Sequence, residues 1–154
     1  MDFQELKDKI YYSDGSLRDI YILQTNMEDN KKWVDFVNEH YIVKWFNGLT
    51  QSDETKIDFE VVQGYLKRDH DLGLSASVFL DKIQINNHFF IETEIENDIS
   101  PKEINSLQDH ERVIGYMISL SKALDKQIIL TPENEQGTIL IKVTNDNVEL
   151  KGLS

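Results

Sequence analysis

Residues 83–104, with the sequence IQINNHFFIETEIENDISPKEI, indicate more about the fold than any other stretch of the chain. Apolar residues alternate with polar ones over residues 83–95, which is the period of a strand whose two faces differ. Since single strands seldom exceed about ten residues, we expect a break or a bulge near residues 86–90. Ser100 and Pro101 then match a helix start, because a capping serine precedes a proline at the first helical position and a glutamate follows three residues after the cap.

The rest of the chain contains strand-like and helix-like segments in an irregular order. Residues 56–68 fit either period, and we favour a short helix capped by Asp58. A turn at residues 13–16 follows a short strand expected near residues 10–12, and residues 50–54 are expected to form a loop. The other expected strands are residues 17–23, 41–46, 74–80, 127–131, 138–143 and an edge at 148–151, and the other expected helices are residues 27–40 and 109–126.

This order of elements favours the α+β class over the regular alternation of a doubly wound fold. The chain has 154 residues and no linker rich in Pro, Gly or Ser, so we expect one globular domain over residues 1–154. Its sheet is expected to be mixed or antiparallel. We expect that sheet to pack against two to four helices, including the long helix near residues 109–126.

The composition argues against several classes of function. The chain carries 16 basic and 28 acidic side chains, a formal net charge of −12, and no basic run longer than a pair. Binding to nucleic acid or to an anionic membrane surface needs clustered Lys and Arg, so neither partner is expected. No apolar run reaches the roughly 20 residues of a membrane span, and the N-terminus lacks a signal-peptide pattern, so a cytoplasmic location is expected. The absence of Cys excludes disulfides and Cys-ligated metal sites.

Acidic residues at alternate positions are the most distinctive chemical feature: Glu92, Glu94, Glu96 and Asp98. In one continuous strand they would project from the same face, together with Gln84, Asn86 and His88 if no bulge intervenes. A solvated strand face, a recognition surface for a basic partner and a metal site are all compatible with this pattern. The metal site is disfavoured, because residues four apart on a strand are separated by roughly 13 Å and cannot share one ion.

Arg18 and Asp19 open an otherwise apolar strand, where one of them is expected to be buried. A buried Arg usually has a carboxylate partner, so a structural ion pair is favoured over a ligand site. His110 follows the expected helix cap and is expected to face solvent, and Trp33 and Trp45 are expected in the core. No nucleophile, phosphate-binding or metal-binding motif occurs, so we predict no catalytic residue, metal or cofactor.

Three stretches of the chain carry a resemblance: DGSLRDIYIL (residues 14–23), HFFIETEIENDISPKEI (residues 88–104) and IILTPENE (residues 128–135). Together they resemble a group of small, acidic, single-domain bacterial proteins of unknown function. The middle stretch differs from that group at Asn97, where the group carries an aromatic residue. The resemblance implies no established activity, and it points towards the immunity or accessory proteins of toxin systems.

These observations favour a non-enzymatic protein-binding module. The specific hypothesis is an immunity-type inhibitor that covers a basic, toxin-like partner with its acidic strand face. The alternative is a small-ligand-binding or enzymatic domain whose polar site is assembled only by the fold, with Arg18, Asp19 and His88 as first candidates. Self-association through aromatic side chains is a third interpretation.

Overall fold

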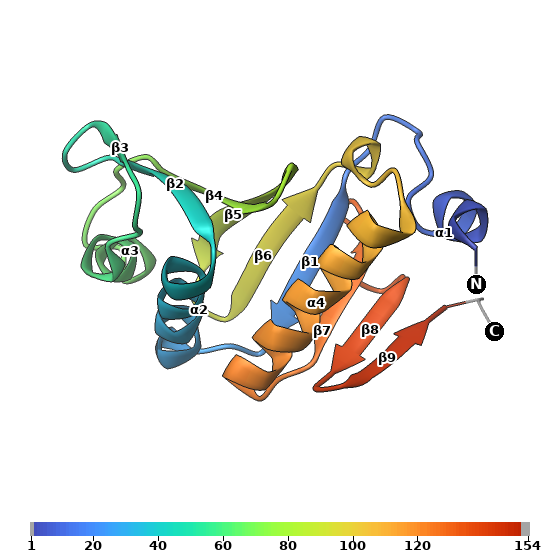
Figure 1. Cartoon of the computed structure of the whole chain (residues 1–154). Coiled ribbons are helices and arrows are strands. Elements are labelled where there is room, and N and C mark those ends of the chain that lie inside the picture. The colour runs from blue at the N-terminus through green and yellow to red at the C-terminus, as the bar shows by residue number, and fades with distance from the viewer. Residues whose placement is uncertain (1, 152–154) are drawn as a thin grey trace.

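An antiparallel sheet of nine strands forms the centre of the computed structural model, which describes residues 2–151. β1 (Arg18–Leu23) is a central strand, because it pairs with β6 (Glu94–Ile99) on one side and with β7 (Ile128–Pro132) on the other. Segments from the beginning, the middle and the end of the chain therefore lie side by side (Figure 1). The remaining strands continue the sheet outward: β5 (Ile83–Ile91), β4 (Leu74–Leu80), β2 (Ile42–Asn47) and β3 (Ser52–Glu54) beyond β6, and β8 (Ile141–Thr144) and β9 (Asn147–Leu150) beyond β7.

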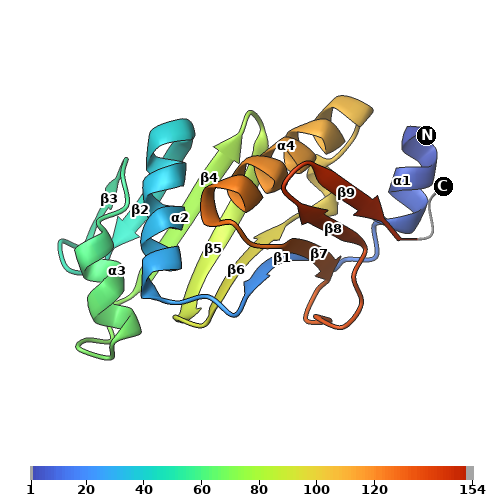
Figure 2. The same ribbon diagram turned by 90° about the horizontal axis from the view of Figure 1, so that it is seen from below.

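Helices cover one face of this sheet (Figures 1 and 2). α2 (Met27–His40) and α4 (Leu107–Leu124) lie next to each other on that face, and α3 (Phe59–Leu66) contacts α2 and β5. α1 (Phe3–Lys9) is joined to the 3-10 turn η1 (Pro101–Glu103) by a hydrogen bond of 2.9 Å between Lys7 Nζ and the Pro101 carbonyl. Alternate side chains of β5 are buried beneath the helices, and those between them point to the opposite, helix-free face, which we call the open face.

A chain of buried polar side chains joins the two long helices to the sheet. Trp33 Nε1 of α2 donates a hydrogen bond to the Tyr116 hydroxyl of α4 at 3.0 Å, and that hydroxyl donates to Asn97 Oδ1 of β6 at 2.6 Å. Asn97 Nδ2 in turn donates to Asn87 Oδ1 of β5 at 2.6 Å. Since a buried polar group without a partner is costly, this chain fixes which sides of β5 and β6 lie under the helices.

The α+β class is confirmed, and most expected elements are present. Asn26 caps α2 in a reciprocal arrangement, because its side chain accepts from the Asp29 N–H at 2.8 Å while the Asp29 carboxylate accepts from the Asn26 N–H at 3.0 Å. The ambiguous residues 56–68 contain α3 with Asp58 as its N-cap, as predicted. Trp33 and Trp45 are buried, also as predicted.

The strand expected over residues 83–95 has an irregular register between His88 and Ile91, close to the bulge expected at residues 86–90. The reversal of the chain at residues 92–93, which makes a hairpin of β5 and β6, was not predicted. A register shift between His88 and Ile91 offsets the two-residue turn, so the alternation of apolar and polar residues returns in β6 with the same parity. Odd-numbered residues are therefore buried, and the even-numbered residues between them lie on the open face, both in residues 83–89 before the turn and in residues 95–99 after it. Thr25, which precedes α2, and Asn30 of α2 hold this turn, since the Thr25 hydroxyl and the Asn30 amide both donate to the Glu92 carbonyl.

Other expectations were also wrong. Ser100 caps only the short η1, and α4 begins at Leu107 with Ser106 as its cap, two residues before the expected helix start. Residues 10–12 form no strand and follow α1, which the sequence did not predict. The expected loop at residues 50–54 contains β3, and the strand expected from residue 138 begins at Ile141. Within residues 2–151, no helix combines the length and apolar character that a membrane span requires.

Gly48, in the turn after β2, lies close to the backbone of the segment that leads into β4, and substituting it tests this close approach. A Cβ atom on Gly48 would lie 2.4 Å from the backbone oxygen of Gly73. We expect Gly48→Ala to lower the free energy of unfolding by roughly 2–4 kcal/mol, because backbone would have to move. Gly115→Ala in α4 is the control: no atom lies within 4 Å of its Cβ position, so the free energy of unfolding should rise by about 0.5–1 kcal/mol. Urea denaturation measures both, and an unchanged Gly48→Ala variant would contradict the close approach.

Candidate functional site

The open face of β5, β6 and β1 brings together most of the acidic residues singled out in the sequence. His88 lies opposite Glu96, Glu96 lies opposite Tyr21, and Asp98 lies opposite Asp19 in the strand register. Side chains at paired positions of antiparallel strands point to the same face and lie about 5 Å apart at Cβ. We call this group the open-face cluster: Asp19, Tyr21, His88, Glu94, Glu96 and Asp98.

His88 and Asp98 form the tightest contact of the open-face cluster. His88 Nε2 lies 2.5 Å from Asp98 Oδ2, and the Asn86 amide donates to the other carboxylate oxygen at 2.9 Å. The hydrogen bond to Asp98 raises the pKa of His88 above its ordinary value, against the opposing effect of burial. Burial alone would raise the pKa of Asp98, but the hydrogen bonds from His88 and Asn86 hold that pKa below its usual range. The Phe90 ring stacks on the imidazole with a centroid distance of 5.3 Å.

Asp19 is almost completely buried at the other side of the cluster. Its carboxylate accepts hydrogen bonds from the Tyr21 hydroxyl at 2.9 Å and from the backbone N–H of Asn134 at 2.7 Å. Burial raises the pKa of Asp19, and the nearby charges of Asp98 and Glu133 raise it further. The loop between β7 and β8, which contains Asn134, lies on the side of the sheet away from α4 (Figure 2).

The two remaining carboxylates are more exposed than Asp19. Burial raises the pKa of Glu96, and the charge of Asp19 adds to this effect. Glu94 accepts a hydrogen bond from the Gln136 amide at 2.6 Å. Among residues 2–151, no Lys or Arg lies within 4.0 Å of the carboxylates of Asp19, Glu94 or Glu96. These three carboxylates therefore lack a Lys or Arg partner within the described chain, and His88, opposite Glu96, is the nearby group that can carry a positive charge.

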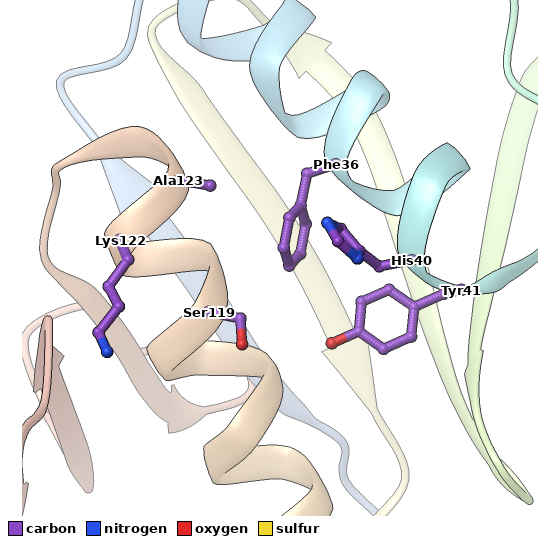
Figure 3. A pocket seen from close by; sticks show the side chains of 6 residues that line it. All are labelled: Phe36, His40, Tyr41, Ser119, Lys122 and Ala123. Carbon is purple, nitrogen blue, oxygen red and sulfur yellow. The ribbon is translucent and has the colours of Figure 1, made fainter.

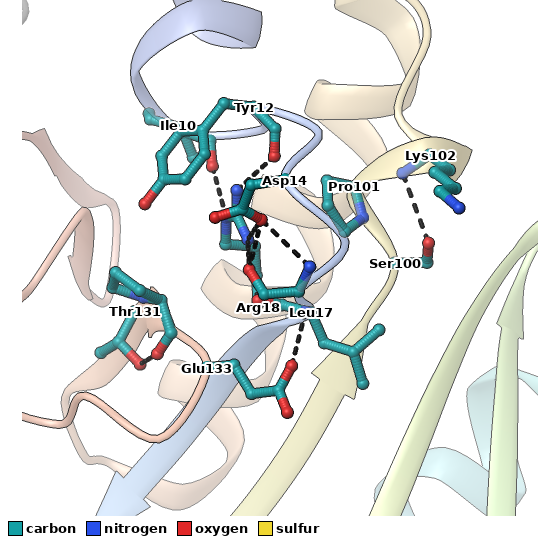
Figure 4. Close-up of polar contacts among 12 residues, drawn as sticks. Ile10, Tyr12, Asp14, Leu17, Arg18, Ser100, Pro101, Lys102, Thr131 and Glu133 are labelled. Carbon is teal, nitrogen blue, oxygen red and sulfur yellow. Dashed lines mark hydrogen bonds and ion pairs between the residues drawn. The ribbon is translucent and has the colours of Figure 1, made fainter.

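Arg18 lies on the opposite face of β1 from Asp19, because successive strand residues alternate. Its guanidinium is fully buried and donates to the backbone carbonyls of Ile10 at 2.7 Å, Leu17 at 2.8 Å and Tyr12 (Figure 4). The exposed Asp14 carboxylate lies 3.9 Å away. Arg18 thus fastens the segment that follows α1 to the start of β1, mainly through backbone oxygens. Of the three residues named for a ligand site, Asp19 and His88 both lie beside Asp98 in the open-face cluster, whereas Arg18 lies on the other face of the sheet.

Two further predicted positions lie outside the cluster. Glu92 sits in the exposed β5–β6 turn and not on a strand face. The expectation that His110 faces solvent is wrong: it is buried, and its Nδ1 lies 2.7 Å from the Tyr11 hydroxyl. His110 precedes the buried Val113 and Met117 by three and seven residues, so it lies on the buried face of α4, where it contacts Tyr11. Asn86 lies on the open face, as the alternation of residues 84–98 predicted, whereas Tyr21 was not predicted because it lies in an apolar segment.

The open-face cluster combines a His–Asp pair with three carboxylates that have no Lys or Arg partner among the described residues. Within the part of the chain that the structure describes, no group of three or more His, Asp or Glu side chains is arranged to hold a metal ion. Comparison with protein-family models, with curated proteins and with solved structures finds no match. The structure defines an α+β domain whose open sheet face carries an acidic cluster.

Replacing Arg18 separates a structural role from a ligand-binding role. We expect Arg18→Met to lower the free energy of unfolding by roughly 2–4 kcal/mol, because several buried carbonyls lose their donor. Arg18→Lys should recover only part of this loss, since one ammonium cannot replace the planar fork of donors. Urea denaturation measures both variants. A stable Arg18→Met protein would show that the buried guanidinium is not needed to hold the fold.

The pH dependence of stability should carry opposite contributions from two histidines. Burial lowers the pKa of His110 from 6.5 to about 4. Between these two pH values, His110 is mostly protonated in the unfolded state and mostly neutral in the folded state. The contribution of His110 to the free energy of unfolding is fully present above pH 6.5. It falls by on the order of 3 kcal/mol as the pH drops towards the pKa of the folded state. His110→Asn should flatten that acid limb in urea denaturation measured across the pH range.

His88 should behave in the reverse direction. Because its pKa is raised above 6.5 by Asp98, the stability from this pair is complete below pH 6.5 while Asp98 stays ionised. That stability is lost as the pH rises through the folded pKa of His88. An NMR titration of the His88 ring should show a midpoint above 6.5, and His88→Gln should remove the alkaline loss. A midpoint below the ordinary value would contradict the contact with Asp98.

Proposed function

We propose that this protein is a non-enzymatic binding module that uses the open-face cluster to bind a basic protein partner. The observation that carries this proposal is the absence of any Lys or Arg beside Asp19, Glu94 and Glu96 among the described residues. Elsewhere, buried acids of the same chain do have cations: Asp109 lies 2.9 Å from Arg112, and Asp29 lies 3.6 Å from Lys126.

Clustered carboxylates without cations destabilise the free protein. Burial and mutual repulsion raise the pKa values of Asp19 and Glu96, so their ionised forms are disfavoured in the folded state. A Lys or Arg side chain from a partner would relieve this repulsion on binding. Such complementary charge mainly accelerates association and rejects wrong partners.

Exposed apolar side chains border the acids. Leu23 lies opposite Glu94 in the strand register and is 38% exposed, and Phe90, stacked on His88, is 53% exposed. Protein interfaces combine such apolar and aromatic contacts with a charged rim. This mixture supports a protein partner over a small cation.

The resemblance to small acidic bacterial proteins favours an immunity-type inhibitor among binding modules. In that case the partner is a basic toxin whose surface the open face covers. The product of the adjacent gene is the first partner to test, by pull-down with the purified proteins.

Glu96→Gln tests whether the charge of Glu96 lowers the free energy of unfolding of the free protein. We expect the free energy of unfolding to rise by about 0.2–1 kcal/mol, the range of cross-strand pairs, because one unneutralised charge is removed. Binding to the partner should weaken in the same variant. A variant that loses both stability and binding would indicate that Glu96 serves the fold instead.

The double variant Glu94→Lys/Glu96→Lys tests the interface directly. Association with the partner should slow by about tenfold or more at low salt, and the difference should shrink as salt screens the charges. The matched control is Glu5→Lys/Glu28→Lys, which makes the same change in net charge on α1 and α2. Surface plasmon resonance of the three proteins measures the rates. Equal rates for the two double variants would place the interface elsewhere.

A further inference from the structure

We propose that a cleft between α2 and α4 binds a small, neutral, planar aromatic molecule that carries a hydrogen-bonding oxygen. The cleft has a volume of about 630 Å³. Its lining residues, shown in Figure 3, are Phe36, His40, Tyr41, Ser119, Lys122 and Ala123. This size lies within the range of small-molecule sites, roughly 300–1,000 Å³. The cleft lies on the helix side of the sheet, so this proposal is independent of the open-face cluster.

The cleft exists because α4 carries small residues along one line of its surface. Gly115, Ser119 and Ala123 follow each other at four-residue spacing, and all three are exposed. No long side chain from these positions fills the space towards α2. A second space of about 370 Å³ shares Tyr41 and Ser119 with the first and continues past Gly115 towards β4. An elongated ligand would therefore have room to extend.

Aromatic rings form the facing wall. The Phe36 and Tyr41 rings lie edge to face with a centroid distance of 5.7 Å, and the Tyr41 ring contacts Tyr116 at 5.8 Å. The Tyr116 hydroxyl is held by Trp33 and Asn97 in the buried polar chain. Because Tyr116 is held in place, the Tyr41 and Phe36 rings have a fixed support. A planar aromatic ligand can pack against these rings in offset or edge-to-face geometry.

Two hydroxyl groups supply the polar contacts. The Tyr41 and Ser119 hydroxyls point into the cleft from α2 and α4, respectively (Figure 3). Neither makes a hydrogen bond to any of residues 2–151. Burial raises the pKa of Tyr41, so its hydroxyl remains a donor at neutral pH. A ligand oxygen between the two groups would satisfy both.

The charges around the cleft favour a neutral ligand. Lys122 extends away from the facing rings in Figure 3, and its Nζ lies 2.7 Å from Asp146 Oδ1. Arg112, which lines the second space, is held by Asp109 at 2.9 Å. Since both cations already have carboxylate partners, neither is available to an anionic ligand without breaking an ion pair.

Benzamide is the probe for this site, with toluene as the matched ring that lacks the oxygen. In ¹H–¹⁵N NMR titrations of the full chain, we expect benzamide to shift the amides of Phe36, Tyr41 and Ser119 in the millimolar range. Tyr41→Phe should weaken binding by about three- to tenfold through the loss of one hydrogen bond. Toluene should bind more weakly than benzamide by a similar factor. Shifts spread over the surface, or none, would overturn the proposal.

Variants on α4 locate the site. Ser119→Leu fills the cleft from an exposed helical position and should abolish benzamide binding. Gln108→Leu makes a similar apolar change on an exposed position outside the cleft and should leave binding intact. Unchanged binding to Ser119→Leu would contradict the site. N-acetyltyrosinamide is titrated in parallel. If this compound binds and benzamide does not, the cleft binds an aromatic side chain of a protein partner, and the proposal of a free small molecule is wrong.

Discussion

The hydrogen bond between Asn97 and Asn87 is the contact on which both faces of the sheet depend. It lies between β5 and β6 beneath the helices, where an unpaired amide would be costly. A shift of β6 by one residue would turn Asn97 to the open face and place Glu96 under the helices, so the pairing fixes the register. The same contact sets His88 opposite Glu96 and thereby positions the open-face cluster.

This pairing also reaches the helices through Tyr116 and Trp33, so one buried polar chain organises two surfaces of different character. On the helix side it supports rigid aromatic rings beside a line of small residues. On the open side it leaves the carboxylates of Asp19, Glu94 and Glu96 close together without a Lys or Arg partner among the described residues, and the proposed binding role depends on this feature. Asn97 connects the sheet to α4 by hydrogen bonds to Asn87 and Tyr116.

Local patterns predicted the elements well where a single physical signal dominated. The Asp58 cap and the apolar period of α4 each depend on residues close in sequence. The β5–β6 hairpin was missed because a register shift and a two-residue turn together preserve the alternation of the pattern. The candidate site was only half predictable for the same reason: Glu94, Glu96, Asp98 and His88 do share a face, but across two strands instead of along one.

The sequence by itself determined the class of the fold, the burial of Trp33 and Trp45, and the acidic segment free of Lys and Arg, because composition and short-range periodicity control these features. Only the tertiary structure decided that β1 lies beside β6, which brings Asp19 and Tyr21 to the acids of that strand. It also decided that Arg18 is held by backbone carbonyls and that His110 is buried against Tyr11. These outcomes depend on which distant segments pair, and pairing is fixed by long-range packing that no local pattern encodes.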